Sequence, residues 1–243
     1  MVTHAVHTAR TIIGIIGNVI SFFLFASPMP TLWRIYKKKS SEEFHPYPYI
    51  ASVMNCLFWI FYGLPIVHPD STLVITINSV GLVLELIYLS IFFFFTHKKY
   101  RLHIFGLLVA EAILLAIVAA LTLKFCHTHK KRSMVVGIVC VIFGVIMYSA
   151  PLSIMAKVIK TKSVEFMPFW LSVAAFSNGI TWTIYALLEF DLYILISNGL
   201  GGVSGALQLI LYAWYNKRTP AVEEDDEGTV KQSAVQLEVK LPA

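Results

Sequence analysis

Long apolar runs separated by short polar segments fill the chain up to residue 214. A helix needs about 20 residues to cross the ~30 Å hydrocarbon core of a bilayer. Runs of this length predict an all-α membrane protein with seven transmembrane helices. The expected spans are 10–33, 47–66, 72–96, 103–125, 133–156, 167–187 and 191–214.

Much of this pattern occurs twice in the chain as an internal repeat. Segment 137–182 repeats segment 14–59 at a shift of 123 residues, and the shift falls to 120 further along, where the second loop is shorter. A repeat of this length indicates two copies of one structural unit. The matched residues include Gly14 and Gly137, Pro28 and Pro151, Asn55 and Asn178, Trp59 and Trp182, Tyr62 and Tyr185, and Asn78 and Asn198.

The number of helices decides how the two copies are oriented. Two three-helix units joined directly would lie upside down relative to each other, whereas the unmatched fourth span puts both the same way up. We therefore expect a 3+1+3 arrangement, with a first repeat over 1–100, a linker helix over 101–131 and a second repeat over 132–218. The polar segment 219–243 begins with acidic residues and is predicted to be a disordered cytoplasmic tail.

Composition excludes several classes of protein. The chain is 57% hydrophobic and 14% charged, so it is not a soluble domain. Its net charge of +5 comes from residues between apolar runs and not from one basic surface, which argues against a nucleic-acid partner. Its three cysteines show no metal-ligand spacing, and no catalytic cluster lies at a common depth. We expect no enzyme activity, no metal and no cofactor.

Lysine and arginine gather on the cytoplasmic side of membrane proteins. An extracellular N-terminus and a cytoplasmic C-terminus place twelve of these residues inside and five outside. The inner set is Arg34, Lys37, Lys38, Lys39, Lys98, Lys99, Arg101, Lys157, Lys160, Lys162, Lys217 and Arg218, and the outer set is Arg10, Lys124, Lys130, Lys131 and Arg132.

Paired polar and aromatic residues within the spans predict a binding site, because repeat proteins of the membrane place substrate between their halves. Asparagine amides both donate and accept hydrogen bonds, and a tryptophan face packs on the C–H face of a sugar ring. No Lys, Arg or His occurs at these levels, so the pattern favours a neutral polyol or sugar. The expected lining is Asn78, Asn198, Trp59, Trp182, Asn55, Asn178, Leu24, Met147 and Ser21.

Prolines mark a second common level. Pro28 and Pro151 lie inside the first and fifth spans near the inner face, where each removes a backbone hydrogen bond and loosens the helix. Pro46, Pro48 and Pro168 begin the second and sixth spans. We expect a hinge for alternating access here.

These features resemble the SWEET family of sugar facilitators over almost the whole chain to about Arg218. The resemblance implies that Asn78, Asn198, Trp59 and Trp182 hold the sugar and that Pro28, Pro48, Pro151 and Pro168 form the inner gate. It assigns Tyr62 and Asp191 to the outer gate, with Tyr185 as the repeat partner of Tyr62. Leu24 and Met147 are bulkier than the valine of sucrose-carrying plant members. The chain therefore resembles the hexose-carrying plant branch, which implies a plasma-membrane location.

The leading hypothesis is a passive, bidirectional uniporter of hexose such as glucose, with the sugar and the bilayer as partners. A proton-coupled transporter of the related PQ-loop type, using Glu85 or Glu111, is one alternative. These two carboxyl residues have no repeat partner, so we expect a structural role for them. A seven-helix sorting receptor is the other alternative. Small-residue faces permit a homo-oligomer without specifying its size.

Overall fold

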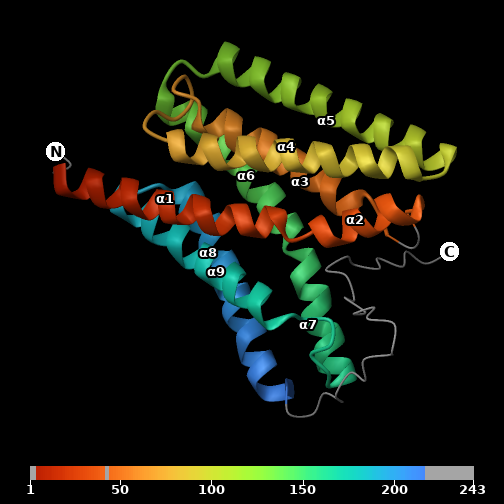
Figure 1. Cartoon of the computed structure of the whole chain (residues 1–243). Helices are drawn as coiled ribbons and strands as arrows, with labels where there is room; N and C mark the ends of the chain where they lie inside the picture. The colour runs from red at the N-terminus through yellow and green to blue at the C-terminus, as the bar shows by residue number, and fades with distance from the viewer. Residues whose placement is uncertain (1–3, 42–43, 217–243) are drawn as a thin grey trace.

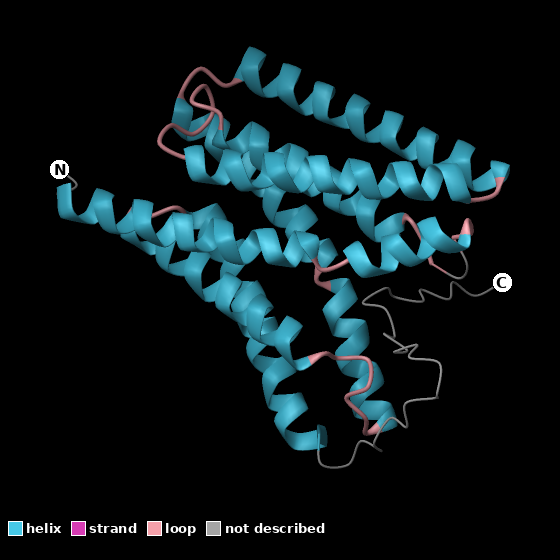
Figure 2. Cartoon of the chain, in the orientation of Figure 1, coloured by secondary structure: helices cyan, strands magenta, loops and turns pink. Residues whose placement is uncertain are grey.

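The computed structural model describes residues 4–41 and 44–216, which form helices and loops with no strand among them (Figures 1 and 2). The predicted all-α fold is confirmed. The predicted tail at 219–243 lies outside the described residues. The helices are α1 (His4–Ala26), α2 (Met29–Lys38), α3 (Tyr47–Gly63), α4 (Thr72–Phe95), α5 (Lys98–Phe125), α6 (His129–Met147), α7 (Ser149–Thr161), α8 (Phe169–Leu188) and α9 (Leu192–Tyr215).

Two pairs of these helices are single spans with a break. Within the described residues, six continuous or broken helices are long and apolar enough to cross a membrane: α1 with α2, α4, α5, α6 with α7, α8 and α9. The 17 residues of α3 form a shorter apolar seventh helix. The chain is therefore a multi-pass integral membrane protein. The second span ends at Gly63 and not at the predicted residue 66, because Leu64 precedes Pro65 and adopts an extended conformation.

The breaks follow from the prolines. Pro28 has no amide hydrogen for the carbonyl of Leu24, so Ser27 supplies two donors in its place, its amide at 3.2 Å and its hydroxyl at 2.7 Å. In the second repeat the break falls at Tyr148, which places Pro151 in the first turn of α7, where helices tolerate proline. Each span therefore ends at its break and restarts as a second helix. Beyond the breaks, α2 and α7 diverge from each other (Figure 1).

The two halves pack reciprocally. In the first half α4 lies between α1 and α3, and in the second half α9 lies between α6 and α8. Contact between the halves is made by α1 with α8 and by α3 with α6. Since α6 repeats α1 and α8 repeats α3, this is the arrangement that a two-fold axis between the halves produces.

The linker helix α5 lies at the edge of the bundle against α3 and α6 (Figure 1). Only two of its residues are buried, and large apolar side chains such as Leu102, Phe105 and Ile113 are exposed along it. A helix with so much exposed apolar surface is suited to lipid. The fourth span therefore lies outside the bundle that the two three-helix halves form.

In the second half, α8 and α9 touch backbone to backbone. A Cβ atom added at Gly179 would lie 2.4 Å from the amide nitrogen of Gly202, so only glycine allows this approach. Glycine pairs of this kind let membrane helices pack closely. The contact fixes the spacing between Asn178 on α8 and Asn198 on α9.

Candidate functional site

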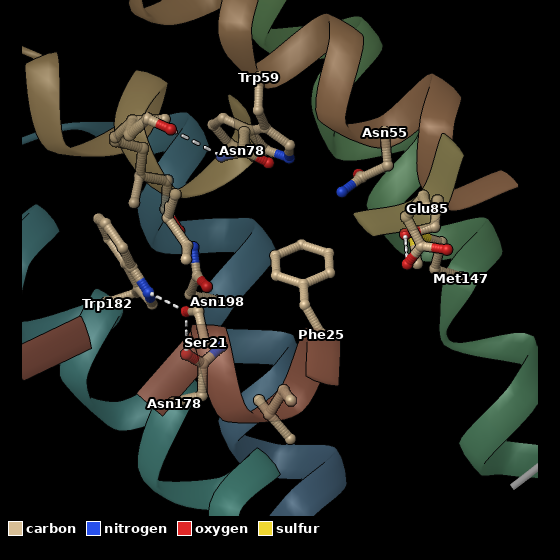
Figure 3. A pocket seen from close by; sticks show the side chains of 15 residues that line it. Ser21, Phe25, Asn55, Trp59, Asn78, Glu85, Met147, Asn178, Trp182 and Asn198 are labelled. Carbon is tan, nitrogen blue, oxygen red and sulfur yellow. Dashed lines mark hydrogen bonds between the residues drawn. The ribbon is translucent and has the colours of Figure 1, made fainter. Parts of the chain in front are cut away.

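A cavity of about 330 Å³ lies between the two halves and is lined from α1, α3, α4, α6, α8 and α9 (Figure 3). All nine residues predicted to bind substrate line it, although their role in binding stays a prediction. They are Ser21, Leu24, Asn55, Trp59, Asn78, Met147, Asn178, Trp182 and Asn198.

Asn78 and Asn198 are held in the same way in the two repeats. The amide nitrogen of Asn78 donates to the carbonyl of Val74 at 2.9 Å, and that of Asn198 donates to the carbonyl of Ile194 at 3.0 Å. A backbone carbonyl can only accept, so each bond fixes which end of the side-chain amide faces the helix. The oxygen and the second N–H of each amide remain for a ligand in the cavity.

A connected group of three side chains forms one wall. The indole N–H of Trp182 donates to Ser21 Oγ at 3.0 Å, and Ser21 Oγ donates to Asn178 Oδ1 at 2.5 Å. The serine therefore fixes both neighbours from another helix. The repeat partner of Asn178 differs, because Asn55 Oδ1 is buried and has no hydrogen-bond partner within residues 4–41 and 44–216.

Aromatic residues cover the cavity on the side where α1 begins, which we call the N-side. Trp59 packs edge-on against Tyr62 with ring centroids 5.4 Å apart, and Trp182 packs in the same manner against Tyr185 at 5.1 Å. All four side chains are buried in the main apolar core. The duplicated pairs therefore separate the cavity from the N-side surface.

Beyond these rings, a largely buried polar latch joins the two halves. It consists of Tyr62, His68, Ser133 and Asp191. The hydroxyl of Tyr62 donates to Asp191 Oδ2 at 2.8 Å, and His68 Nε2 lies 3.3 Å from the same oxygen. The other carboxylate oxygen caps α9 by accepting from the amides of residues 193 and 194. His68 Nδ1 also lies 2.9 Å from Ser133 Oγ, so the latch includes α6.

Charges around the latch affect its histidine. Burial lowers the pKa of His68 below its ordinary value of about 6.5, Asp191 acts in the opposite direction, and Arg10 lowers the pKa further. Arg10 pairs with Glu189 and donates to the carbonyl of Asp70 at 3.1 Å, while its guanidinium lies 4.3 Å from the ring centroid of Tyr185. The predicted gate residues Tyr62, Tyr185 and Asp191 thus lie on the N-side. Tyr62 hydrogen-bonds Asp191, whereas the ring of Tyr185 packs against Arg10.

Comparison with known proteins identifies the family. A sequence model of the family described as "sugar efflux transporter for intercellular exchange" matches residues 11–100 and 134–220. The chain belongs to the SWEET family of sugar transporters. It is 54% identical to "Bidirectional sugar transporter SWEET5" of Arabidopsis thaliana over 96% of this chain and 97% of that protein. It is 58% identical to "Bidirectional sugar transporter SWEET4" of the same plant over 96% and 93% of the two chains.

A solved structure of a eukaryotic SWEET transporter has the same fold. It superposes with a TM-score of 0.84 at 39% identity, over 88% of this chain and 99% of that chain. The family is one of transporters and not of enzymes. This confirms the predicted resemblance to SWEET proteins and the prediction that the chain is not an enzyme.

The four predicted gate prolines of this SWEET chain all lie on the side opposite the N-side, which we call the proline side. Pro28 lies at the first break, and Pro151 lies in the first turn of α7 just after the second. Pro48 is in the first turn of α3, and Pro168 precedes α8. The breaks are held by tyrosines: Tyr88 donates to the carbonyl of Phe25 at 2.9 Å, and Tyr148 donates to that of Ser197 at 2.5 Å.

The structure adds residues that the repeat pattern does not reveal. Phe25, Ser52 and Glu85 also line the cavity, so its wall contains a carboxyl group in addition to neutral pairs. Glu85 is visible in the sequence as an acidic residue within a span, but it has no repeat partner. On the N-side, Arg10 lies near the start of α1 and Glu189 follows the end of α8. Their positions in the sequence do not show that these two helix ends meet, so their ion pair could not be predicted.

Proposed function

We propose that this SWEET-family chain carries hexose, such as glucose, passively and in both directions across the membrane by alternating access. The observation that supports this most is the cavity between the halves, with Asn78 and Asn198 each tethered to its own helix and each keeping free hydrogen-bonding capacity. A pair of amides across a cavity matches the hydroxyl groups of a sugar. The bidirectional transport named for the two Arabidopsis relatives supports the proposal.

The size of the cavity supports a monosaccharide. Its volume of about 330 Å³ is near the lower end of the range of about 300–1,000 Å³ for small-molecule pockets. The bulky side chains of Leu24, Phe25 and Met147 all line it. Small residues at these positions would leave room for a second sugar ring.

We further propose that the N-side faces the cell exterior and the C-terminus the cytoplasm, because the predicted inner set of lysines and arginines outnumbers the outer set by twelve to five. The resemblance to the hexose-carrying plant branch supports a plasma-membrane location. In this orientation the latch residues Tyr62 and Asp191, with the ring of Tyr185, form the outer gate. The inner gate consists of Pro28, Pro48, Pro151 and Pro168. The working units are then residues 1–100, the linker 101–131 and residues 132–218. The closed latch corresponds to an inward-facing state.

Uptake of radiolabelled glucose into proteoliposomes tests this function. Asn78→Ala and Asn198→Ala should each abolish saturable uptake while the protein still elutes as a single species in detergent. Asn216→Ala is the matched control, because Asn216 is exposed at the end of α9 and away from the cavity. Wild-type uptake in both cavity variants would remove the site from consideration.

Glu85 supports a second candidate, a proton-coupled transporter. Its side chain is 5% exposed and lines the cavity, and intramembrane carboxyl groups often relay protons. An imposed pH gradient with equal sugar on both sides distinguishes the two mechanisms. Passive transport produces no net accumulation of sugar, whereas proton coupling drives accumulation along the proton gradient.

A further inference from the structure

The polar groups of the cavity are not symmetric. Ser52 and Glu85 in the first half have Ala175 and Gly205 at the matching repeat positions, at shifts of 123 and 120 residues. Glu85 is therefore a carboxyl group on one wall of the cavity with no counterpart at the matching position of the other. The symmetric pairs cannot distinguish the two ends of a sugar, but this wall can.

The carboxyl group is held in place yet incompletely satisfied. Ser52 Oγ donates to Glu85 Oε1 at 2.8 Å, and both side chains are buried. Glu85 Oε2 has no hydrogen-bond partner in the described part of the chain, and neither does Asn55 Oδ1. Both residues line the same cavity, and in Figure 3 they lie on one side of Phe25.

The opposite wall has already used its groups. Asn178 Oδ1 accepts from Ser21, and the N–H of Trp182 donates to Ser21, on the other side of Phe25 in Figure 3. Folded proteins leave few buried polar atoms without a partner, and those that remain indicate a missing partner such as a ligand. Among the described residues that line the cavity, the fully buried oxygen atoms without a partner are therefore Asn55 Oδ1 and Glu85 Oε2.

We propose that Asn55 and Glu85 form a sugar-orienting subsite, in which Glu85 Oε2 and Asn55 Oδ1 hydrogen-bond the hydroxyl groups at one end of a monosaccharide. Ser52 is a positioning residue that holds the carboxyl group towards the cavity. The subsite rests on the proposed sugar transport and adds an orientation to it. A site built to bond a hydroxyl group discriminates strongly against an analogue that lacks it, because its own polar groups then stay unpaired.

A series of monodeoxy-glucoses tests the subsite in competition with radiolabelled glucose uptake into proteoliposomes. In the wild type, removal of the hydroxyl group that meets Glu85 should raise the half-inhibitory concentration about 10- to 100-fold. In Glu85→Gln the penalty at that one position should shrink while the penalties at the other positions persist. In Ser52→Ala the same penalty should shrink in part.

Glu111→Gln is the matched control, since Glu111 is an intramembrane carboxyl residue on α5 that does not line the cavity. Its profile should equal that of the wild type. An unchanged profile in both Glu85→Gln and Ser52→Ala, or an equal loss of inhibition by every sugar, overturns the subsite. Absence of saturable uptake of any monosaccharide by the wild type overturns the proposed function itself.

Discussion

The hydroxyl of Tyr62 is the group by which α3 hydrogen-bonds Asp191 of the other half. Tyr62→Phe removes that hydroxyl and keeps the ring, which packs against Trp59 and stacks on His68 with centroids 4.9 Å apart. Asp191 retains the two amides that cap α9. The change therefore weakens the latch without removing the core beneath it.

The size of the effect follows from the bond that is lost. A hydrogen bond to a charged group contributes about 1.5–3 kcal/mol. The bond is buried, because Tyr62 is 0% exposed and Asp191 is 3% exposed. Since each 1.4 kcal/mol is about a factor of ten in an equilibrium constant, opening on the N-side should become about 10- to 150-fold more frequent.

Thiol labelling measures this equilibrium. With Cys56, Cys126 and Cys140 replaced, Val74→Cys puts one reporter in the cavity wall, where it is buried by the covering aromatic rings. A membrane-impermeant reagent added on the N-side should label this thiol about 10- to 150-fold faster in Tyr62→Phe, provided that the closed state dominates the wild type.

The repeat supplies the control for this measurement. Tyr185→Phe makes the same chemical change at the matching position, where the ring lies against Arg10. Among the described residues, Asp191 accepts a hydroxyl hydrogen bond from Tyr62 and not from Tyr185. Its labelling rate should stay close to that of the wild type. Wild-type labelling of Tyr62→Phe, or equal acceleration in both variants, would refute the assignment of the latch.

Two further predictions concern packing and pH. Gly179→Ala should lower the melting temperature in detergent, because its Cβ would lie 2.4 Å from Gly202 and overpacking costs about 1–3 kcal/mol. Gly199→Ala is the control, because a Cβ there would have no neighbour within 4 Å, and its melting temperature should equal that of the wild type. Equal melting temperatures for the two variants would contradict this prediction. The pKa of His68 is lowered in the closed latch, so this residue binds a proton more readily when the latch opens and the ring is solvated. Protonation therefore favours the open state, and N-side labelling should rise as the pH falls below about 6.5. His68→Gln should remove that dependence, and its persistence would place the proton elsewhere.

The spans were predictable because each must supply about 20 apolar residues of its own to cross a bilayer. The ends of helices were less so. The break at Pro28 follows from the missing amide of that residue, but the break in the second repeat falls at Tyr148, three residues before Pro151, where a shared hydrogen bond from its amide ends α6. Proline therefore marked the level of each break without fixing its residue.

The cavity was predictable only where the two repeats agree. Asn78 with Asn198 and Trp59 with Trp182 stand out because duplication keeps the same residue at the same depth. Glu85 has no such partner, so nothing in the pattern distinguishes it from a carboxyl group buried between helices. Its contact with Ser52 and its place in the cavity wall depend on how α3 packs against α4.

The sequence by itself determined the membrane environment, the duplicated three-helix unit and the paired residues of the site, because these depend on local apolar length and on comparison of the chain with itself. Only the tertiary structure decided which side of the cavity is closed and which polar atoms remain unused. Those properties arise from contacts between the two halves, such as Tyr62 with Asp191 and Ser21 with Asn178, whose partners are more than 120 positions apart. Packing of α1 on α8 and of α3 on α6 brings them together, and no local pattern encodes that distance.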